Sequence, residues 1–152
     1  MTQWNNEIEA SAGEIIDKIT ILNIKLIKIE DEEKVKNVQY ELELLAENFV
    51  TMLNYLSIEQ REQLKNLKAN LFAINLRLWN IKEAVRQKGS ELFGSSVTHD
   101  EFIYSLPQEK MWTANQFMLL ARDTYLVNQE RFSLKCKINE LLKSPIVEEK
   151  SH

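Results

Sequence analysis

Two neighbouring stretches of the chain, 35–56 and 64–85, carry apolar residues at uninterrupted alternating spacings of three and four. Residues with this spacing share one face of an α-helix, whereas a half-buried strand would alternate at every second residue. A pattern kept over about three heptads predicts long helices that pack against other helices. The positions are Val35, Val38, Leu42, Leu45, Phe49, Met52 and Leu56, then Leu64, Leu67, Leu71, Ile74, Leu78, Ile81 and Val85.

Two further helices are predicted, one at each end of the chain. The residues at 11–14, Ser-Ala-Gly-Glu, are typical of a capping box that opens a helix. The helix behind them is apolar on two flanks, so we expect it to be central in the fold or at an oligomer interface. The last helix is predicted to begin at Pro107, where a missing N–H does no harm, and to end near Lys143 because Pro145 follows.

These patterns predict an all-α fold. Three glycines and two prolines in 152 residues are too few for the turns of a β protein. The short connections between the first three helices favour a single domain, a four-helix up-down bundle with long second, third and fourth helices. The alternative is a pair of extended helical hairpins that form a dimeric coiled coil. Outside the helices we expect an N-terminal arm at 1–10, a loop at 94–106, with Gly89 and Gly94 framing the end of the third helix, and a C-terminal tail at 144–152.

Composition and charge exclude several classes of protein. A net charge of −4 argues against general nucleic-acid binding, which needs a basic surface. The longest apolar stretch, 15–29, is interrupted by charged residues and cannot span a membrane. The N-terminus has no basic and apolar regions of a signal peptide, and the single Cys136 rules out an internal disulfide. We therefore expect a cytoplasmic protein.

No set of residues typical of a catalytic or metal site is present. The two histidines, His99 and His152, are not spaced with Cys136 or with each other as metal ligands would be. The chain also has no glycine-rich phosphate-binding loop. We expect no cofactor and no metal, and a helical interaction or accessory protein more than an enzyme, with a protein partner or a second copy of the chain.

A row of polar residues is the unusual feature of the last predicted helix. At 100° per residue the row lies between two apolar flanks. It consists of Asn128, Arg131, Lys135 and Asn139. One flank contains Phe117, Leu120, Val127, Leu134, Ile138 and Leu141, and the other contains Met118, Tyr125, Phe132 and Cys136. We expect this row to lie within an apolar surround, where charge is costly unless it is paired and hydrogen-bonded.

Two interpretations of the polar row stay open. The row can pair with acidic residues of the same chain, for which the candidates are Glu14, Asp17, Asp31 and Glu41. Alternatively it can bind a small anionic or sugar-phosphate ligand, because arginine offers a planar fork and lysine a point charge to an oxyanion. The candidate ligand-binding residues are Asn128, Arg131, Lys135, Asn139, Glu14, Asp17 and Lys18.

The two ends of the chain resemble those of a bacterial protein family. The N-terminal segment reads Gly-Glu-Ile-Ile-Asp-Lys-Ile-Thr-Ile-Leu at 13–22, and the C-terminal segment reads Lys-Cys-Lys-Ile-Asn-Glu-Leu-Leu at 135–142 with Ile-Val-Glu-Glu-Lys-Ser at 146–151. Both resemble a family of small proteins defined as a domain of unknown function, over about a third of the chain. Members tend to be encoded near surface-glycan and glycosyltransferase genes, which implies a role beside polysaccharide assembly.

The resembling segments also predict a tertiary contact. They include Glu14, Asp17 and Lys18 at one end, and Arg131, Lys135 and Asn139 at the other. We therefore expect the first and last helices to touch, with Glu14 or Asp17 near Arg131 or Lys135.

Overall fold

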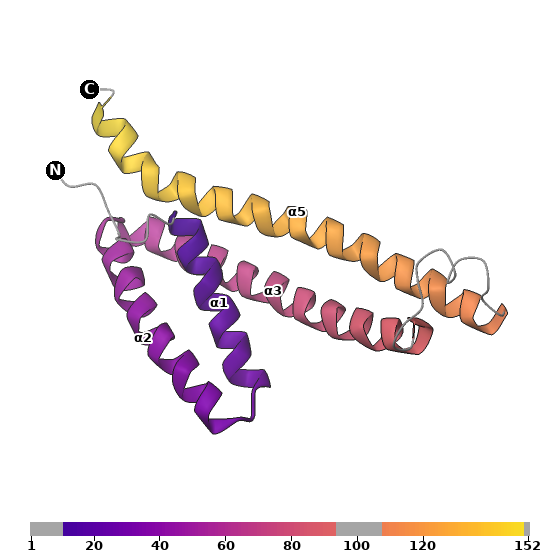
Figure 1. Cartoon of the computed structure of the whole chain (residues 1–152). Coiled ribbons are helices and arrows are strands. Elements are labelled where there is room, and N and C mark those ends of the chain that lie inside the picture. The colour runs from indigo at the N-terminus through magenta and orange to yellow at the C-terminus, as the bar shows by residue number, and fades with distance from the viewer. Residues whose placement is uncertain (1–10, 94–107, 151–152) are drawn as a thin grey trace. The chain divides into compact units, whose positions relative to one another are not determined.

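The computed structural model describes residues 11–93 and 108–150, with side chains at 11–90 and 114–143. These residues form helices and no strand. The helices are α1 (Ala12–Lys28), α2 (Glu32–Asn54), α3 (Ile58–Phe93) and α5 (Gln108–Lys150), as Figure 1 shows. The all-α helical fold predicted from the sequence is confirmed.

Contacts within the chain define two compact units. The described part of the first unit comprises 11–76 and 130–150, and that of the second comprises 77–93 and 108–129. The first unit therefore contains α1, α2, the beginning of α3 and the end of α5. The second contains the end of α3 and the beginning of α5.

Serine side chains cap the starts of two helices. The hydroxyl of Ser11 accepts a hydrogen bond from the Glu14 backbone N–H at 3.2 Å, at the start of α1. At the start of α3 the bonding is reciprocal, because Ser57 Oγ accepts from the Gln60 N–H at 3.2 Å and Gln60 Oε1 accepts from the Ser57 N–H at 3.0 Å. Each cap satisfies N–H groups that have no partner inside the helix.

Asp31 caps α2 and carries the first testable prediction. Its Oδ1 atom accepts hydrogen bonds from the N–H groups of Glu33 at 3.0 Å and Lys34 at 3.4 Å. We expect Asp31→Ala to lower the free energy of unfolding by about 1 kcal/mol, since both N–H groups lose their acceptor. Urea unfolding measures this, with Glu30→Ala as the control because Glu30 is exposed and precedes the cap. Equal effects of the two substitutions would contradict the capping role.

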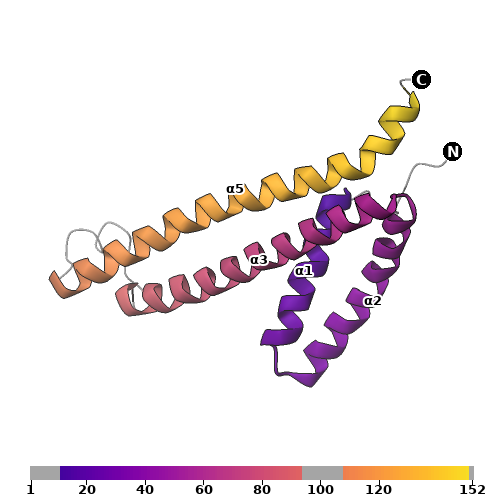
Figure 2. The ribbon, with the colours of Figure 1, turned by 180° about the vertical axis from the view of Figure 1, so that it is seen from behind.

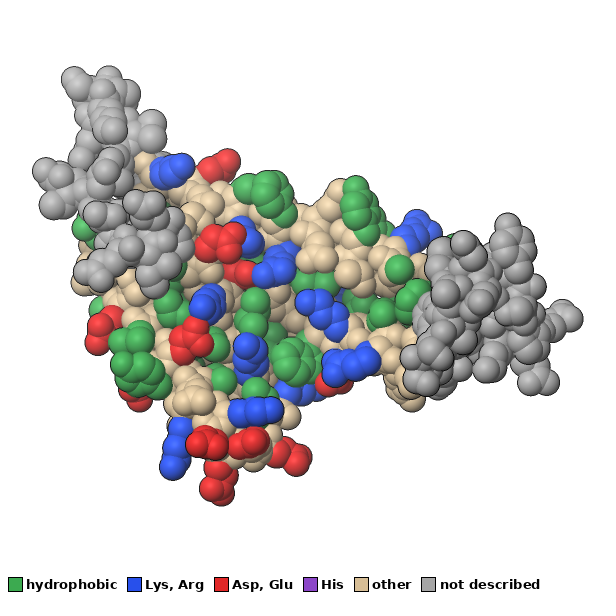
Figure 3. Space-filling model, viewed as in Figure 1, with side chains coloured by type: hydrophobic (Ala, Val, Ile, Leu, Met, Phe, Trp, Pro, Cys, Tyr) green, Lys and Arg blue, Asp and Glu red, His purple; other side chains and the backbone are tan. Residues whose placement is uncertain are grey.

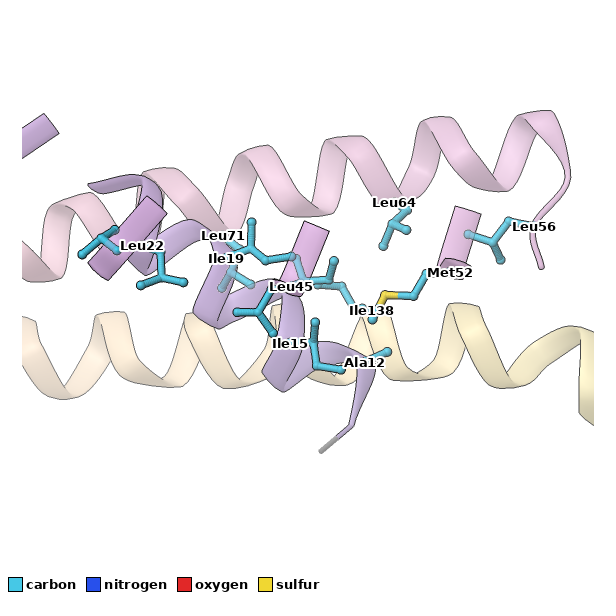
Figure 4. Packing of buried hydrophobic residues seen from close by; sticks show 12 residues of the cluster. Ala12, Ile15, Ile19, Leu22, Leu45, Met52, Leu56, Leu64, Leu71 and Ile138 are labelled. Carbon is cyan, nitrogen blue, oxygen red and sulfur yellow. The ribbon is translucent and has the colours of Figure 1, made fainter. Parts of the chain in front are cut away.

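The core of the first unit surrounds α1, as expected for a helix that is apolar on two flanks. Figure 4 shows its side chains meeting residues of the other three helices. Helices α1 and α2 are antiparallel neighbours joined by residues 29–31 (Figures 1 and 2). The buried cluster consists of Ala12, Ile15, Ile16, Ile19, Leu22, Val38, Leu45, Met52, Leu56, Leu64, Leu71 and Ile138.

One helix end differs from the prediction. Helix α3 ends at Phe93, within the interval framed by Gly89 and Gly94 as predicted, and it accommodates Gly89 because one glycine inside a long helix costs only about 1 kcal/mol. Helix α5 continues through Pro145 to Lys150, so the expectation of a tail is wrong for residues 144–150. A proline removes one N–H donor and crowds the preceding turn, which can kink a helix without ending it. The expected arm at 1–10, the loop at 94–106 and the start of the last helix at Pro107 lie outside the described residues.

Candidate functional site: a charged cluster between α1 and α5

The backbones of α1 and α5 approach closely at Gly13. Its N–H donates to Asn139 Oδ1 at 2.7 Å. A Cβ atom placed on Gly13 would lie 2.6 Å from the carbonyl oxygen of Lys135 and 3.1 Å from Asn139 Oδ1. Only glycine leaves room for this approach, and it brings the first turns of α1 within reach of the polar side chains of α5.

Asp17 is the centre of the cluster. Its side chain is only 4% exposed and accepts a hydrogen bond from Arg131 Nε at 2.9 Å through Oδ1. Arg131 Nη2 donates to the other carboxylate oxygen, so the guanidinium holds the carboxylate with two parallel bonds. These bonds raise the pKa of the Arg131 guanidinium above its ordinary value, against the opposing effect of its partial burial.

Asn75 and Thr20 complete the buried part of the cluster. Asn75 Nδ2 lies 2.8 Å from Asp17 Oδ1 and 2.8 Å from Thr20 Oγ1, and the Thr20 hydroxyl donates to the Asp17 carbonyl at 2.7 Å. Sequence reasoning missed both residues. The available signal was that each is a polar residue at a position where the helical spacing predicts an apolar, core-facing one. Asn75, for example, follows Leu71 by four and precedes Leu78 by three.

Two ion pairs lie nearer the surface. Lys135 Nζ is 2.5 Å from Glu14 Oε1, and the lysine side chain is 18% exposed. Lys18 Nζ is 2.6 Å from Glu41 Oε1, with both side chains about half exposed. The second pair contributes little to stability because water screens it. Asp31, the remaining acidic candidate, caps α2 instead of meeting the polar row.

The predicted contact between the first and last helices is therefore confirmed, with Asp17 on Arg131 and Glu14 on Lys135. Within the described residues, every buried polar side-chain atom has a hydrogen-bond partner. Each charge of the cluster is thus compensated inside the chain, which is what an ion-pair network that sets the register of two helices requires. The ligand-binding role of these residues stays a prediction.

One expectation about the surroundings of the polar row is wrong. The row was expected to lie within an apolar surround, yet the side chains of Met118, Tyr125 and Phe132 on one of its two flanks are 64–67% exposed. Cys136, on the same flank, is half-buried. Asn128 is exposed and lies in the second unit, whereas Arg131, Lys135 and Asn139 lie in the first. Of the two apolar flanks, the one containing Val127 and Ile138 is packed inward.

The described part of the chain offers no cluster of three or more His, Cys, Asp or Glu side chains that could hold a metal ion. Nor do its helices include one long and apolar enough to cross a membrane. Comparison of the chain with protein-family models, curated proteins and solved structures gives no match.

Proposed function

We propose that this protein is a helical interaction protein whose α5 helix binds an amphipathic helix of a protein partner. The observation that carries the proposal is a group of large apolar side chains left in solvent on the part of α5 in the second unit. Met118 is 67% exposed, Leu119 58%, Tyr125 64% and Leu126 44%. Contiguous exposed apolar residues mark interaction surfaces more often than scattered single ones do.

These four residues share one face of the helix, which we call the α5 face. The pairs Met118-Leu119 and Tyr125-Leu126 are seven residues apart, so they stand two turns apart on the same side. In Figure 3, apolar side chains project along α5 between basic and acidic ones. An apolar face with a seven-residue spacing suits a partner helix, which would insert its own apolar residues between these two pairs.

Arg122 favours a different protein over a second copy as the partner. It is exposed and lies between the two apolar pairs of the α5 face. Two copies paired in parallel, or antiparallel about the middle of this face, would place two Arg122 guanidinium groups together, and like charges in contact are unfavourable. The partner helix we propose carries an acidic residue opposite Arg122. Because the chain ends resemble a family encoded near surface-glycan genes, we would look for the partner first among proteins of surface-polysaccharide assembly.

The proposal is tested by site-specific photo-crosslinking in the cells that produce the protein. A crosslinking residue replaces Leu126 on the α5 face, or Tyr40 on α2 as a control that is more exposed, 66% against 44%. We expect position 126 to crosslink to one defined protein and position 40 not to do so. Arg122→Glu should weaken the crosslink at least tenfold, because it sets a negative charge against the acidic partner residue.

Two outcomes would contradict the proposal. One is crosslinking of position 126 to a second copy of the chain, with the purified protein dimeric by light scattering. The other is the same crosslinked protein at positions 126 and 40, which would indicate non-specific apolar contact.

A further inference from the structure

A pocket in the first unit, apart from the charged cluster and the α5 face, has the composition of a ligand site. It has a volume of about 500 Å³ and lies between α1, α2 and α3, whose ribbons Figure 2 shows from behind. This volume falls in the range of small-molecule sites, about 300–1,000 Å³. Its lining consists of Thr20, Asn23, Phe49, Lys65, Lys68, Ala69 and Phe72.

The charge in this pocket is one-sided. Lys65 and Lys68 line it, and no aspartate or glutamate does. Lys65 is exposed and lies 4.0 Å from Glu62 on its own helix, a distance at which the pair binds weakly. Lys68 has no carboxylate partner among the residues that the structure describes. The pocket therefore presents two ammonium groups that an anion could neutralise.

Lys68 is held in an environment that is unfavourable for an unpaired charge. Its Nζ atom lies 4.7 Å from the centre of the Phe49 ring, and the side chain is half-buried. Burial lowers the pKa of Lys68 from its ordinary value. The ring offers some compensation through a cation–π contact, but a ring is a weaker partner than a carboxylate. An anion in the pocket would therefore stabilise the charged form of Lys68.

We propose that this pocket binds a small aromatic anion, whose negative group is held by Lys68 and Lys65 and whose ring packs against Phe49 and Phe72. The aromatic part follows from the two half-buried phenyl rings among the lining residues. Asn23, also half-buried and without a side-chain hydrogen bond in the described part of the chain, supplies an amide for a polar substituent. The negative group can be a carboxylate or a phosphate, because either would contact the same two lysines, so the test includes both.

Binding is measured by NMR titration of the isotope-labelled full chain with benzoate, phenyl phosphate, acetate and inorganic phosphate. A ligand of this size in an open pocket implies a dissociation constant on the order of 1 mM for the aromatic anions. We expect benzoate or phenyl phosphate to shift the amide signals of Asn23, Phe49, Lys68 and Phe72. Acetate and inorganic phosphate should bind at least tenfold more weakly, because they lack the ring.

Three variants separate binding from folding. Lys68→Met should weaken aromatic-anion binding at least tenfold while melting at the same temperature as the parent or higher, since it removes an unpaired, half-buried charge. Lys68→Arg should retain binding within about threefold, because the positive charge remains. Lys36→Met makes the same charge change on an exposed residue of α2 and should leave binding unchanged.

Several results would overturn the proposal. These are aromatic anions that bind no better than acetate and inorganic phosphate, binding that survives Lys68→Met, or binding that Lys36→Met weakens equally. A large loss of stability in Lys68→Met would also count against it, because the lysine would then be structural.

Discussion

Replacing Asp17 by alanine is expected to lower the free energy of unfolding by about 3 kcal/mol. Removing one member of a buried ion pair typically costs about 3–5 kcal/mol, because the other charge stays in place without a partner. The lower end applies here, since the Arg131 side chain keeps 27% exposure and can recruit water. Asn75 also loses one of its two acceptors and retains only the Thr20 hydroxyl.

Thermal and urea unfolding of Asp17→Ala measure this effect, which corresponds to a fall in melting temperature of roughly 10 °C for a chain of this length. Glu41→Gln is the matched control, because it breaks the exposed pair with Lys18 and should cost less than about 1 kcal/mol. The double variant Asp17→Ala with Arg131→Met should be less destabilised than the sum of the two single changes. Additive effects would show that the two side chains stabilise the fold independently.

Replacing Gly13 by alanine is expected to destabilise the protein by about 2 kcal/mol, although alanine is the better helix former. The added methyl group would lie 2.6 Å from the Lys135 carbonyl oxygen, so α1 and α5 must move apart in the first unit. Such overpacking costs about 1–3 kcal/mol. Separation also strains the bond from the Gly13 N–H to Asn139, worth about 1 kcal/mol, and a propensity gain of at most about 1 kcal/mol offsets part of the total.

Asn139→Ala distinguishes the two causes. It removes the acceptor of the Gly13 N–H but leaves the helix approach unobstructed, so it should cost about 1 kcal/mol and less than Gly13→Ala. Urea unfolding of both variants measures the two losses in free energy of unfolding and so separates the steric effect from the lost hydrogen bond. If Gly13→Ala matches or exceeds the stability of the parent, the close approach of the two helices is not what requires glycine at this position.

The helices themselves followed from local chemistry that the sequence displays directly. Ser11, Asp31 and Ser57 begin helices because their side chains accept N–H groups a few residues away. The stripe from Val35 to Leu56 faces inward along its whole length, as its spacing predicted. The local signal was weaker at the end of α5, where Pro145 was expected to stop a helix that in fact continues to Lys150.

Part of the charged cluster was also predictable. Glu14, Asp17, Arg131 and Lys135 were expected to meet because opposite charges on apolar helices must find partners on burial, and the two ends of the chain resembled one family. Asn75 was not expected, since an asparagine on an apolar stripe can face either the core or solvent.

What the sequence determines by itself is therefore the set of helices, the caps that begin α1, α2 and α3, and the inward-facing stripes of α2 and α3. Those properties depend on residues within a few positions of one another. Only the tertiary structure decided which apolar flank of α5 is packed and which carries Met118 and Tyr125 into solvent. It also placed Lys68 over Phe49 without a carboxylate partner in the described residues. Both outcomes depend on which helices lie beside which, and the spacing of residues along one helix carries no information about that choice.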